Sequence, residues 1–555
     1  MVTTIKSDDR IPTDCHFKVK AGPGAGKTYW LIGHINNILA HSDRLGKCGK
    51  IACITYTNAG VDTIVGRLGF TAKSVEVCTI HSFFYNHIVK PYLWLISDKE
   101  GFNIDLLKGE DDRFDLSYTT LESIKKETNQ KYANNECLMN AIKNARWRID
   151  KKSSIVCKPE HAWKAKAGGP YLSDRTYMSY KNRAWGKGLM HYDDVIYFAY
   201  RLFEEVPFVQ EVVARKFPFL LIDEFQDSHP IQVGLIKKIA SHGSMVGVIG
   251  DPAQSIYKFL GADVAQFNDF SLPNMQEYSI SGNRRSTKAI VNFLNSIRKD
   301  LKQSPCRGDV GELPMLLIGT HIDNYRRVQE IVKTSVYALS YDNLSANSLK
   351  VKMKANKQDK NLIDNIVDSN EERKLIIVTF IKALEHAKTC NFKKVFDLMR
   401  GLDIPVKETV VIIQNLLSFY DNIRKMSLYE FFEYVNNAFA IGLTSMKKGN
   451  ILSFYTGHLY SQVAMSVNHE DDDGEQRTIH KAKGDEFDNV MVCLSEEKDI
   501  DFFLQPNLED KESHRVYYVG ASRAREKLFF SIPSLGKEIR EEIGTLGIII
   551  KDSSI

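Results

Sequence analysis

The sequence lacks any apolar run approaching 18 residues, the length that a membrane-spanning helix needs. Its first ten residues, MVTTIKSDDR, are charged where a signal peptide would need an apolar stretch. Nine cysteines are scattered along the chain, with no C-x-x-C pair and no Cys/His group that supplies four ligands. This scatter argues against a zinc site and against a disulfide framework. Together these absences favour a cytoplasmic protein.

The composition is that of a folded globular protein, with 43% hydrophobic and 26% charged residues. Single hydrophobic cores stop growing at about 250–300 residues, so 555 residues predict two large domains, with room for insertions. The net charge of +5 is unevenly placed, because Leu138–Met190 alone carries +9 and the remainder carries −4.

A candidate phosphate-binding loop lies near the start of the chain. AGPGAGKT follows an expected strand at His16–Lys20 and precedes an expected helix at Tyr29–Ala40, the context that a G-x-x-x-x-G-K-[ST] loop requires. Lys27 would reach the β- and γ-phosphates of ATP, and Thr28 would bind Mg²⁺. The residues expected around the nucleotide are Ala21, Gly22, Pro23, Gly24, Ala25, Gly26, Lys27, Thr28 and Tyr29.

Two more expected strands end in polar residues. Phe217–Ile222 is an apolar run suited to a strand buried on both faces, and it runs directly into DEFQD. Met245–Ile249 shows the same pattern and runs into GDPAQS. Because α/β sheets bind ligands at the carboxyl ends of their strands, we assign Asp223 to Mg²⁺ and Glu224 to the attacking water. Gln254 is expected to sense the γ-phosphate.

These motifs form part of a longer series along the chain. The other segments are TYTNAGVDTIVGRL (Thr55–Leu68), CTIHSFF (Cys78–Phe84), HYDDVIYFAYRLF (His191–Phe203), GDPAQSIYKFLGA (Gly250–Ala262), SGNRRST (Ser281–Thr287), RTIHKAKGDEFDNV (Arg477–Val490) and VYYVGASRAREKL (Val516–Leu528). In this order they resemble the motifs of UvrD/Rep-type superfamily 1 DNA helicases. The resemblance implies a motor that hydrolyses ATP with Mg²⁺ and moves 3′ to 5′ along single-stranded DNA. In that family the phosphate loop usually begins with alanine, as it does here.

The resemblance also assigns roles around the nucleotide. Arg285 and Arg523 match the arginine fingers that stabilise charge on the γ-phosphate, and Glu486 matches a position that contacts the nucleotide sugar. Two base-reading elements depart from the family pattern. The upstream glutamine is missing, since the first glutamine is Gln130, and the tyrosine that stacks on adenine is replaced by Arg284. We therefore expect weaker discrimination in favour of ATP than is usual in the family.

Contacts to DNA are expected in the same motifs. Phe259 stands where the family has tryptophan and keeps an aromatic face for base stacking. For Phe259 and Tyr257 the alternative is packing in the core. The full set of expected DNA contacts is Thr57, Asn58, His81, Ser82, Tyr257, Phe259 and His480.

The expected fold class is α/β, with two RecA-like P-loop domains that contain parallel sheets and each carry a mainly helical insertion. Residues 1–94 and 190–274 are assigned to the first RecA-like domain, and 95–189 to its basic insertion. Residues 275–304 and 469–555 are assigned to the second RecA-like domain, and 305–468 to its insertion. Helices are expected within this second insertion at Leu375–Leu384, Val395–Leu402, Lys407–Tyr420 and Leu428–Ala440.

The basic segment has two interpretations. Its cations would track phosphates and its aromatic residues would stack on bases, as in a nucleic-acid surface. Alternatively, a solvated basic face covers a small aromatic core. The aromatic residues concerned are Trp147, Trp163, Tyr171, Tyr177, Tyr180 and Trp185.

Three functions remain open at this point. The chain is expected to act on single-stranded or partly duplex DNA as a helicase or translocase, either in an anti-phage defence complex or as a stand-alone repair helicase. Alternatively, it is a DNA-sensing ATPase that activates a partner nuclease without processive unwinding. Its short length and NHIVKPY (Asn86–Tyr92) resemble GajB-type helicase subunits of Gabija anti-phage systems, which implies an OLD-type, GajA-like nuclease partner. No nuclease constellation follows Ser531 in the sequence.

Overall fold

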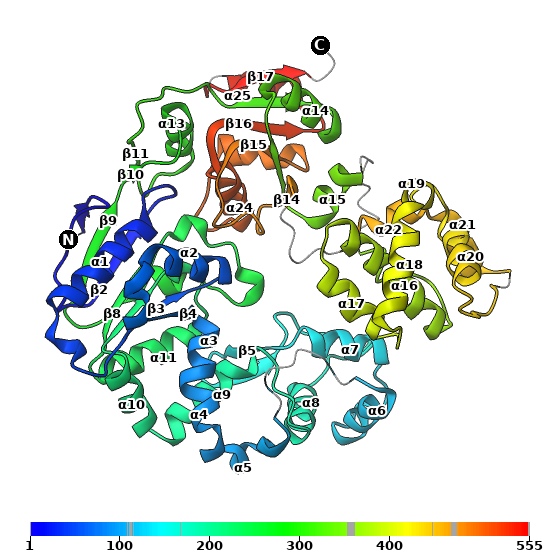
Figure 1. Cartoon of the computed structure of the whole chain (residues 1–555), viewed down its shortest axis with the longest axis horizontal. Helices are drawn as coiled ribbons and strands as arrows, with labels where there is room; N and C mark the ends of the chain where they lie inside the picture. The colour runs from blue at the N-terminus through cyan, green and yellow to red at the C-terminus, as the bar shows by residue number, and fades with distance from the viewer. Residues whose placement is uncertain are drawn as a thin grey trace. The chain divides into compact units, whose positions relative to one another are not determined.

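The computed structural model describes residues 2–107, 109, 114, 116–166, 168–351, 361–446, 448–467, 474–544 and 546–552. The chain divides into two compact units, Met1–Arg284 and Arg285–Ile555. Each unit is built on its own parallel sheet (Figure 1), which confirms the expected α/β class. None of the helices in these described ranges combines the length and apolar character needed to cross a bilayer.

The first unit contains a seven-stranded sheet with parallel pairings. It includes the strands expected before the phosphate loop, before DEFQD and before GDPAQS. In spatial order the strands are β1 (Thr3–Ile5), β9 (Gln276–Ile280), β2 (Phe17–Ala21), β8 (Met245–Gly250), β7 (Phe219–Ile222), β3 (Ile51–Thr55) and β4 (Val75–Thr79).

Alternation along the central strands divides the first unit into two cores. On β3, Ile51 and Cys53 pack with the apolar side chains of α1 and α2, whereas Ala52 and Ile54 pack with those of α9, α10 and α11. This two-residue period is what a strand covered on both faces produces. The helices that bury these faces are α1 (Lys27–His41), α2 (Asn58–Leu68), α3 (Ile80–Phe84), α9 (Asp194–Glu205), α10 (Phe208–Lys216) and α11 (Pro230–Ser241).

The insertion in the first unit is not wholly helical. It contains an antiparallel hairpin, and its elements are α5 (Ser97–Glu100), α6 (Tyr118–Glu127), α7 (Asn135–Lys143), β5 (Arg146–Ile149), β6 (Ile155–Lys158) and α8 (Asp174–Gly186). Its apolar side chains belong to the same core as those of α9–α11. The insertion therefore shares a core with the sheet instead of forming a core of its own.

Buried hydrogen bonds anchor the insertion to α9. The indole N–H groups of Trp147 and Trp185 donate to the two oxygens of Asp194 over 2.9 and 3.0 Å. The ammonium of Lys181 forms an ion pair of 2.6 Å with the same carboxylate. Both indoles, Tyr177 and Tyr180 are buried, so these aromatics form a core and do not offer faces to bases. The stacking interpretation is wrong for these four residues.

The second unit contains a six-stranded sheet, again with parallel pairings. Its spatial order is β14 (Gln476–Thr478), β13 (Tyr337–Ser340), β15 (Phe487–Cys493), β16 (Ala524–Ile532), β12 (Met315–Ile318) and β17 (Ile549–Asp552). The helices beside these strands are α13 (Lys288–Ile297), α14 (His321–Val332), α15 (Asn343–Val351), α24 (Glu512–Ala521) and α25 (Lys537–Gly544).

Two expected segment assignments differ from the observed sheets. Strand β9 was placed with the second domain, but it pairs with β1 and β2 in the first sheet. Strands β12 and β13 were placed in a helical insertion, but they belong to the second sheet. The sequence pattern does not show which sheet such a strand joins, because that depends on pairing between segments distant in sequence.

The helices predicted in the second insertion are confirmed. In sequence they lie between α15 and β14, and they pack around one apolar core. The elements are α16 (Glu371–Lys388), α17 (Phe392–Arg400), α18 (Val406–Ser418), α19 (Tyr420–Ile423), α20 (Leu428–Ala438), α21 (Asn450–Gly457) and α22 (Tyr460–Ala464).

A buried histidine in α1 predicts a pH dependence of stability. His34 stacks on Trp30 with ring centroids 5.2 Å apart, and burial lowers the pKa of His34 to about 4. In the unfolded chain the pKa of this histidine is about 6.5. Below pH 6.5 the unfolded state therefore binds a proton that the folded state does not bind. The free energy of unfolding should therefore fall by about 2 kcal/mol between pH 7 and pH 5 through this group.

His34→Phe keeps a flat ring and removes the titration, so the variant should lose less stability over this range. Chemical unfolding followed by circular dichroism at pH 7 and pH 5 measures the difference. His41→Phe, which changes an exposed histidine of the same helix, is the matched control. Equal losses in wild type and His34→Phe would contradict the prediction.

Candidate functional site

The phosphate loop connects β2 to the first turn of α1. Gly24 and Gly26 have φ of 68° and 80°, a left-handed backbone that glycine adopts without strain. At Gly26 a Cβ would lie 3.2 Å from the Cβ of Ser7, a tight contact that Ser7 would have to relieve by a small shift. Helix α1 has no side-chain cap and no acidic residue in its first turn. Its N-terminus is thus suited to an anion.

Lys27 lies among carboxylates at the carboxyl edge of the first sheet. Its Nζ is 3.1 Å from Glu224 Oε1, and the two side chains are 11% and 26% exposed. Burial alone would lower the pKa of Lys27. The carboxylates of Glu224, Asp223 and Asp251 more than offset burial and raise this pKa, so the ammonium stays charged.

The backbone at the end of β7 is in an uncommon conformation. Glu224 has φ 53° and ψ 36°, a left-handed conformation that costs a non-glycine residue about 1–3 kcal/mol. Asp223 Oδ1 accepts from the N–H of Glu224 over 2.9 Å, which helps to hold this turn. Strain of this kind clusters at functional sites, and here it aims the Glu224 carboxylate at Lys27.

Gln226 joins two strand ends and was missed by sequence reasoning. Its Nε2 donates to Glu224 Oε2 over 2.5 Å, and its Oε1 accepts from the N–H of Asp251 over 3.0 Å. Gln254 donates to Asp251 Oδ2 over 2.6 Å, so both glutamines lie beside the carboxylates. The signal available in the sequence was a further polar residue within DEFQD, directly after an apolar strand.

The donor set suits Mg²⁺ held jointly with a nucleotide. Mg²⁺ in phosphate sites takes one or two protein carboxylates, with the remaining ligands from phosphates and water. Asp223 and the hydroxyl of Thr28 match this small set. Across the described part of the chain, no group of three or more His, Cys, Asp or Glu side chains could hold a metal by itself.

An N-terminal segment packs against the phosphate loop. Arg284 donates from its backbone N–H to Gly24 O over 2.8 Å and from Nε to Ser7 Oγ over 3.0 Å. Its guanidinium also lies 3.7 Å from Asp8 and remains 56% exposed. Trp30 Nε1 donates to Asp9 O over 3.1 Å, which fixes the segment to α1. Sequence reasoning placed Arg284 at the base but assigned nothing to residues 7–9.

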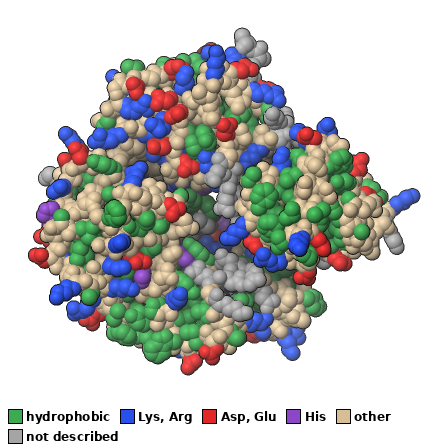
Figure 2. Space-filling view, viewed as in Figure 1, with side chains coloured by type: hydrophobic (Ala, Val, Ile, Leu, Met, Phe, Trp, Pro, Cys, Tyr) green, Lys and Arg blue, Asp and Glu red, His purple; other side chains and the backbone are tan. Residues whose placement is uncertain are grey.

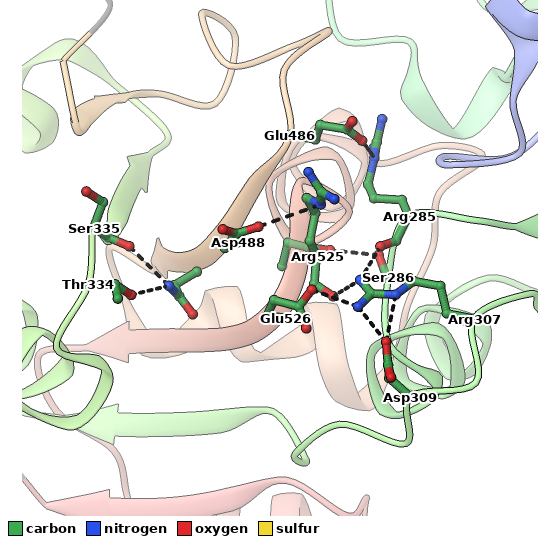
Figure 3. Close-up of polar contacts among 12 residues, drawn as sticks. Arg285, Ser286, Arg307, Asp309, Thr334, Ser335, Glu486, Asp488, Arg525 and Glu526 are labelled. Atoms are coloured by element: carbon green, nitrogen blue, oxygen red, sulfur yellow. Dashed lines mark hydrogen bonds and ion pairs between the residues drawn. The ribbon is translucent and has the colours of Figure 1, made fainter.

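Arg285 and Arg523 lie in the second unit, and the Arg285 side chain reaches the backbone beside Arg523. Arg285 Nε donates to Glu486 Oε2 over 2.6 Å (Figure 3). Its Nη1 donates to Ser522 O over 2.9 Å. Arg523 is 2% exposed and donates from Nε to Val519 O over 3.1 Å. Burial would raise the pKa of Glu486, but the Arg285 guanidinium holds it below its ordinary value. The three residues expected at the nucleotide from this unit thus lie together.

Two aromatic pairs mark the expected DNA-contacting motifs of the first unit. Tyr257 stacks on Tyr56 with ring centroids 5.1 Å apart, and Phe259 lies edge-on to Tyr257 and is 59% exposed. His81 stacks on Tyr192, which is 53% exposed, with centroids 3.5 Å apart. Tyr56 and Tyr192 were not predicted, although both stand inside the motifs that were.

The remaining expected DNA contacts occupy helix starts and a turn. Thr57 and Asn58 are exposed, and the Thr57 side chain caps α2 by accepting from Gly60 N over 3.1 Å. Ser82 accepts a 2.9 Å hydrogen bond from Thr79 at the start of α3. In the second unit, His480 lies edge-on to Tyr341, with centroids 6.3 Å apart.

Comparisons with known proteins agree with this arrangement. Residues 9–273 match the UvrD/REP helicase N-terminal domain, and residues 407–534 match the UvrD-like helicase C-terminal domain. The ATP-dependent DNA helicase PcrA of Bacillus subtilis (strain 168) is 29% identical over 301 residues, which cover 52% of this chain and 38% of PcrA. The ATP-dependent DNA helicase srs2 of Schizosaccharomyces pombe is 28% identical over 316 residues, or 52% of this chain and 34% of srs2.

PcrA of Staphylococcus aureus (strain Mu50) is 25% identical over 317 residues, which cover 55% of this chain and 41% of that PcrA. The matched part of this chain thus covers less than half the length of each of these relatives. The two domain matches follow one another in order, one in each unit, and together they cover more than half of the chain. The chain therefore belongs to the UvrD/Rep-type superfamily 1 helicase family.

Proposed function

We propose that this chain is an ATP- and Mg²⁺-dependent DNA helicase or translocase that moves 3′ to 5′ on single-stranded DNA. The observation that supports this best is the convergence of Lys27, Asp223, Glu224 and Gln254 around the phosphate loop. Family membership and the printed activity of PcrA and srs2, ATP-dependent DNA helicases, support the same proposal.

In the proposed reaction, Lys27 binds the β- and γ-phosphates and exchanges part of its pairing with Glu224 for them. The freed Glu224 carboxylate accepts a proton from the attacking water, and Gln226 keeps that carboxylate oriented. Asp223 and Thr28 would hold Mg²⁺, which neutralises charge developing on the phosphates. Gln254 lies beside Asp251 and is placed to report whether the γ-phosphate is present.

The second unit would supply positive charge to the same reaction. We assign Arg285 and Arg523 to the γ-phosphate, where a guanidinium stabilises the transition state. Glu486, which already binds Arg285, would release it in part when it contacts the nucleotide sugar. Hydrolysis would then depend on the state of both units, and this dependence is what turns chemistry into movement.

DNA would run over the aromatic pairs of the first unit. Tyr56, Tyr257 and Phe259 form one stacking surface, and His81 with Tyr192 forms another. A stacked base contributes about 1–3 kcal/mol in single-strand channels, irrespective of its identity. The exposed Lys151, Lys152, Lys164 and Lys166 of the insertion would add sequence-independent attraction to the phosphates.

A second function is favoured by one surface of the first unit. Trp94 and Phe208 are 62% and 52% exposed, and Tyr92 lies edge-on to Phe208. Figure 2 shows hydrophobic side chains gathered at the lower left, where Figure 1 places α4 (Lys90–Tyr92) and α10. Exposed aromatic clusters of this kind are typical of protein interfaces. The cluster overlaps the GajB-like NHIVKPY, so we propose an OLD-type, GajA-like nuclease as its partner in anti-phage defence.

The central prediction concerns the proposed catalytic carboxylate. Glu224→Gln keeps the shape of the side chain but removes the base, so DNA-stimulated ATP hydrolysis should fall by about 10²–10⁴-fold. ATP binding should persist, because the phosphate loop is unchanged. Steady-state hydrolysis and nucleotide binding measure the two effects, with the exposed Glu330→Gln of α14 as control. Hydrolysis at the wild-type rate would refute the assignment.

Nucleotide selectivity is the second prediction for this site. Because the upstream glutamine is missing and Arg284 replaces tyrosine, GTP should be hydrolysed within about tenfold of ATP, a difference of roughly 1.4 kcal/mol. Arg284→Tyr should widen the gap in favour of ATP by restoring a ring for the base. The measurement compares kcat/KM for ATP and GTP at saturating DNA. A strong ATP preference in the wild type would reject this prediction.

The partner proposal has its own test. Trp94→Ser combined with Phe208→Ser should abolish co-elution with a GajA-like nuclease while leaving DNA-stimulated ATP hydrolysis intact. Phe70→Ser, which changes a 95% exposed phenylalanine elsewhere in the unit, is the matched control. A strand-displacement assay on the isolated chain separates the alternatives. Unwinding of 3′-tailed duplexes without the nuclease favours a stand-alone helicase, whereas hydrolysis without unwinding favours the DNA-sensing ATPase.

A further inference from the structure

A loop that carries none of the predicted motifs runs beside both proposed arginine fingers. Residues 306–312 follow α13 in sequence and lie along the start of β16. Lys527 on β16 forms an ion pair of 2.7 Å with Glu312, and the backbone N–H groups of Lys288 and Ala289 donate to Asp309 O and Val310 O over 3.0 and 2.8 Å. The loop is therefore bonded at once to β16 and to the first turn of α13.

Within this loop, Arg307 forms hydrogen bonds to several neighbouring segments (Figure 3). Its Nη1 donates to the backbone carbonyl oxygens of Arg285 and Arg525 over 2.9 and 3.4 Å. Its Nη2 donates to Glu526 Oε1 over 2.8 Å and to Asp309 Oδ2 over 2.6 Å. The side chain is 22% exposed, so these bonds are largely shielded from water.

The two backbone segments that Arg307 joins are those that carry the fingers. Arg285 is one finger, and Arg525 lies two residues after the other, Arg523. Two further hydrogen bonds complete the junction: Ser286 Oγ donates to Ala524 O over 2.7 Å, and Thr287 N donates to Arg525 O over 3.0 Å. A displacement of either segment would break the fork of Arg307.

The loop can pack closely on these segments because it has a glycine, Gly311, at the point of contact. Gly311 has φ +73°, and a Cβ there would lie 2.4 Å from Thr287 Oγ1. A side chain at this position would push the loop away from the finger segment. Glycine thus permits the approach that brings Arg307 within reach of both carbonyls.

We propose that Arg307 is a positioning residue that holds Arg285 and Arg523 in register for hydrolysis. It acts through the backbone of the finger segments, to which its guanidinium is hydrogen-bonded. This inference rests on the proposed function, because it matters to activity only if the arginines act on the nucleotide. A misplacement near 1 Å can cost about 10²-fold in rate, so a small relaxation of the junction would be visible.

Lysine cannot replace Arg307 in this role. The guanidinium presents donors in a fixed planar fork, and here two of its nitrogens bind four separate acceptors. A lysine ammonium at the end of a flexible stem can keep an ion pair with Asp309 or Glu526, but it would not fix the two carbonyls relative to one another. Arg307→Lys thus preserves charge and removes geometry.

The experiment is a double-mutant cycle on DNA-stimulated ATP hydrolysis with the full chain. Arg307→Met and Arg307→Lys should each lower kcat by about 10–100-fold, with KM for ATP and affinity for DNA nearly unchanged. In an Arg285→Ala background, Arg307→Met should cause a smaller fold loss than in the wild type, because one of the two groups it positions is already gone. A merely structural role would produce multiplicative losses in kcat.

The matched control is Arg327→Met. Arg327 lies in the same unit and also donates to a backbone carbonyl, that of Asp552, over 2.6 Å, but at the β17 edge of the sheet. Arg327→Met should lower the melting temperature about as much as Arg307→Met and leave kcat unchanged. If Arg307→Met does not fold, Glu526→Gln and Arg307→Lys carry the test.

The outcomes distinguish a failure of the positioning role from a failure of the proposed function. If Arg285→Ala lowers kcat but the Arg307 variants do not, the positioning role is overturned and the proposed function stands. Multiplicative losses in the cycle overturn it as well. If Arg285→Ala itself leaves kcat unchanged, the finger assignment fails, and the role of Arg307 fails with it.

Discussion

One cation among three carboxylates determines how the first unit is organised. The Lys27 ammonium is 3.1 Å from Glu224 and close to Asp223 and Asp251, and these charges keep it protonated in spite of burial. The excess negative charge suits a divalent cation, and the ammonium suits a phosphate. The sheet brings these groups together, because β2, β7 and β8 are neighbours and all end at the same edge. Gln226 then joins two of the strand ends directly.

Much of this site could be predicted from the sequence, since each motif combines a buried strand with a polar end. The phosphate loop, DEFQD and GDPAQS were placed at strand ends, and β2, β7 and β8 are found there. What failed was information that the local pattern does not contain. Strands β9, β12 and β13 are short, and only tertiary pairing reveals their sheets. Composition also could not tell that Trp147 and Trp185 face Asp194 and not solvent.

Three of the residues that sequence reasoning missed support others instead of reacting. Gln226 orients Glu224, Ser7 holds Arg284, and Arg307 joins the two finger segments. Ser7 and Arg307 are common residue types outside a recognisable spacing, so their roles depend on contacts between parts of the chain that are distant in sequence. Ser7 and Arg284, for instance, are separated by 277 positions. Motifs therefore identify the reacting groups, whereas the structure is needed to identify what keeps them in place.

The shared core of the first insertion limits how this protein can be dissected. Trp147, Tyr180 and Trp185 pack in the same apolar cluster as α9–α11, and Asp194 of α9 accepts both indole N–H groups. Excising residues 95–189 would deprive the Asp194 carboxylate of both indole donors and of Lys181, and would uncover a wide apolar face on the helix that leads to DEFQD. A minimal motor made by trimming this insertion would consequently be insoluble unless that face were redesigned.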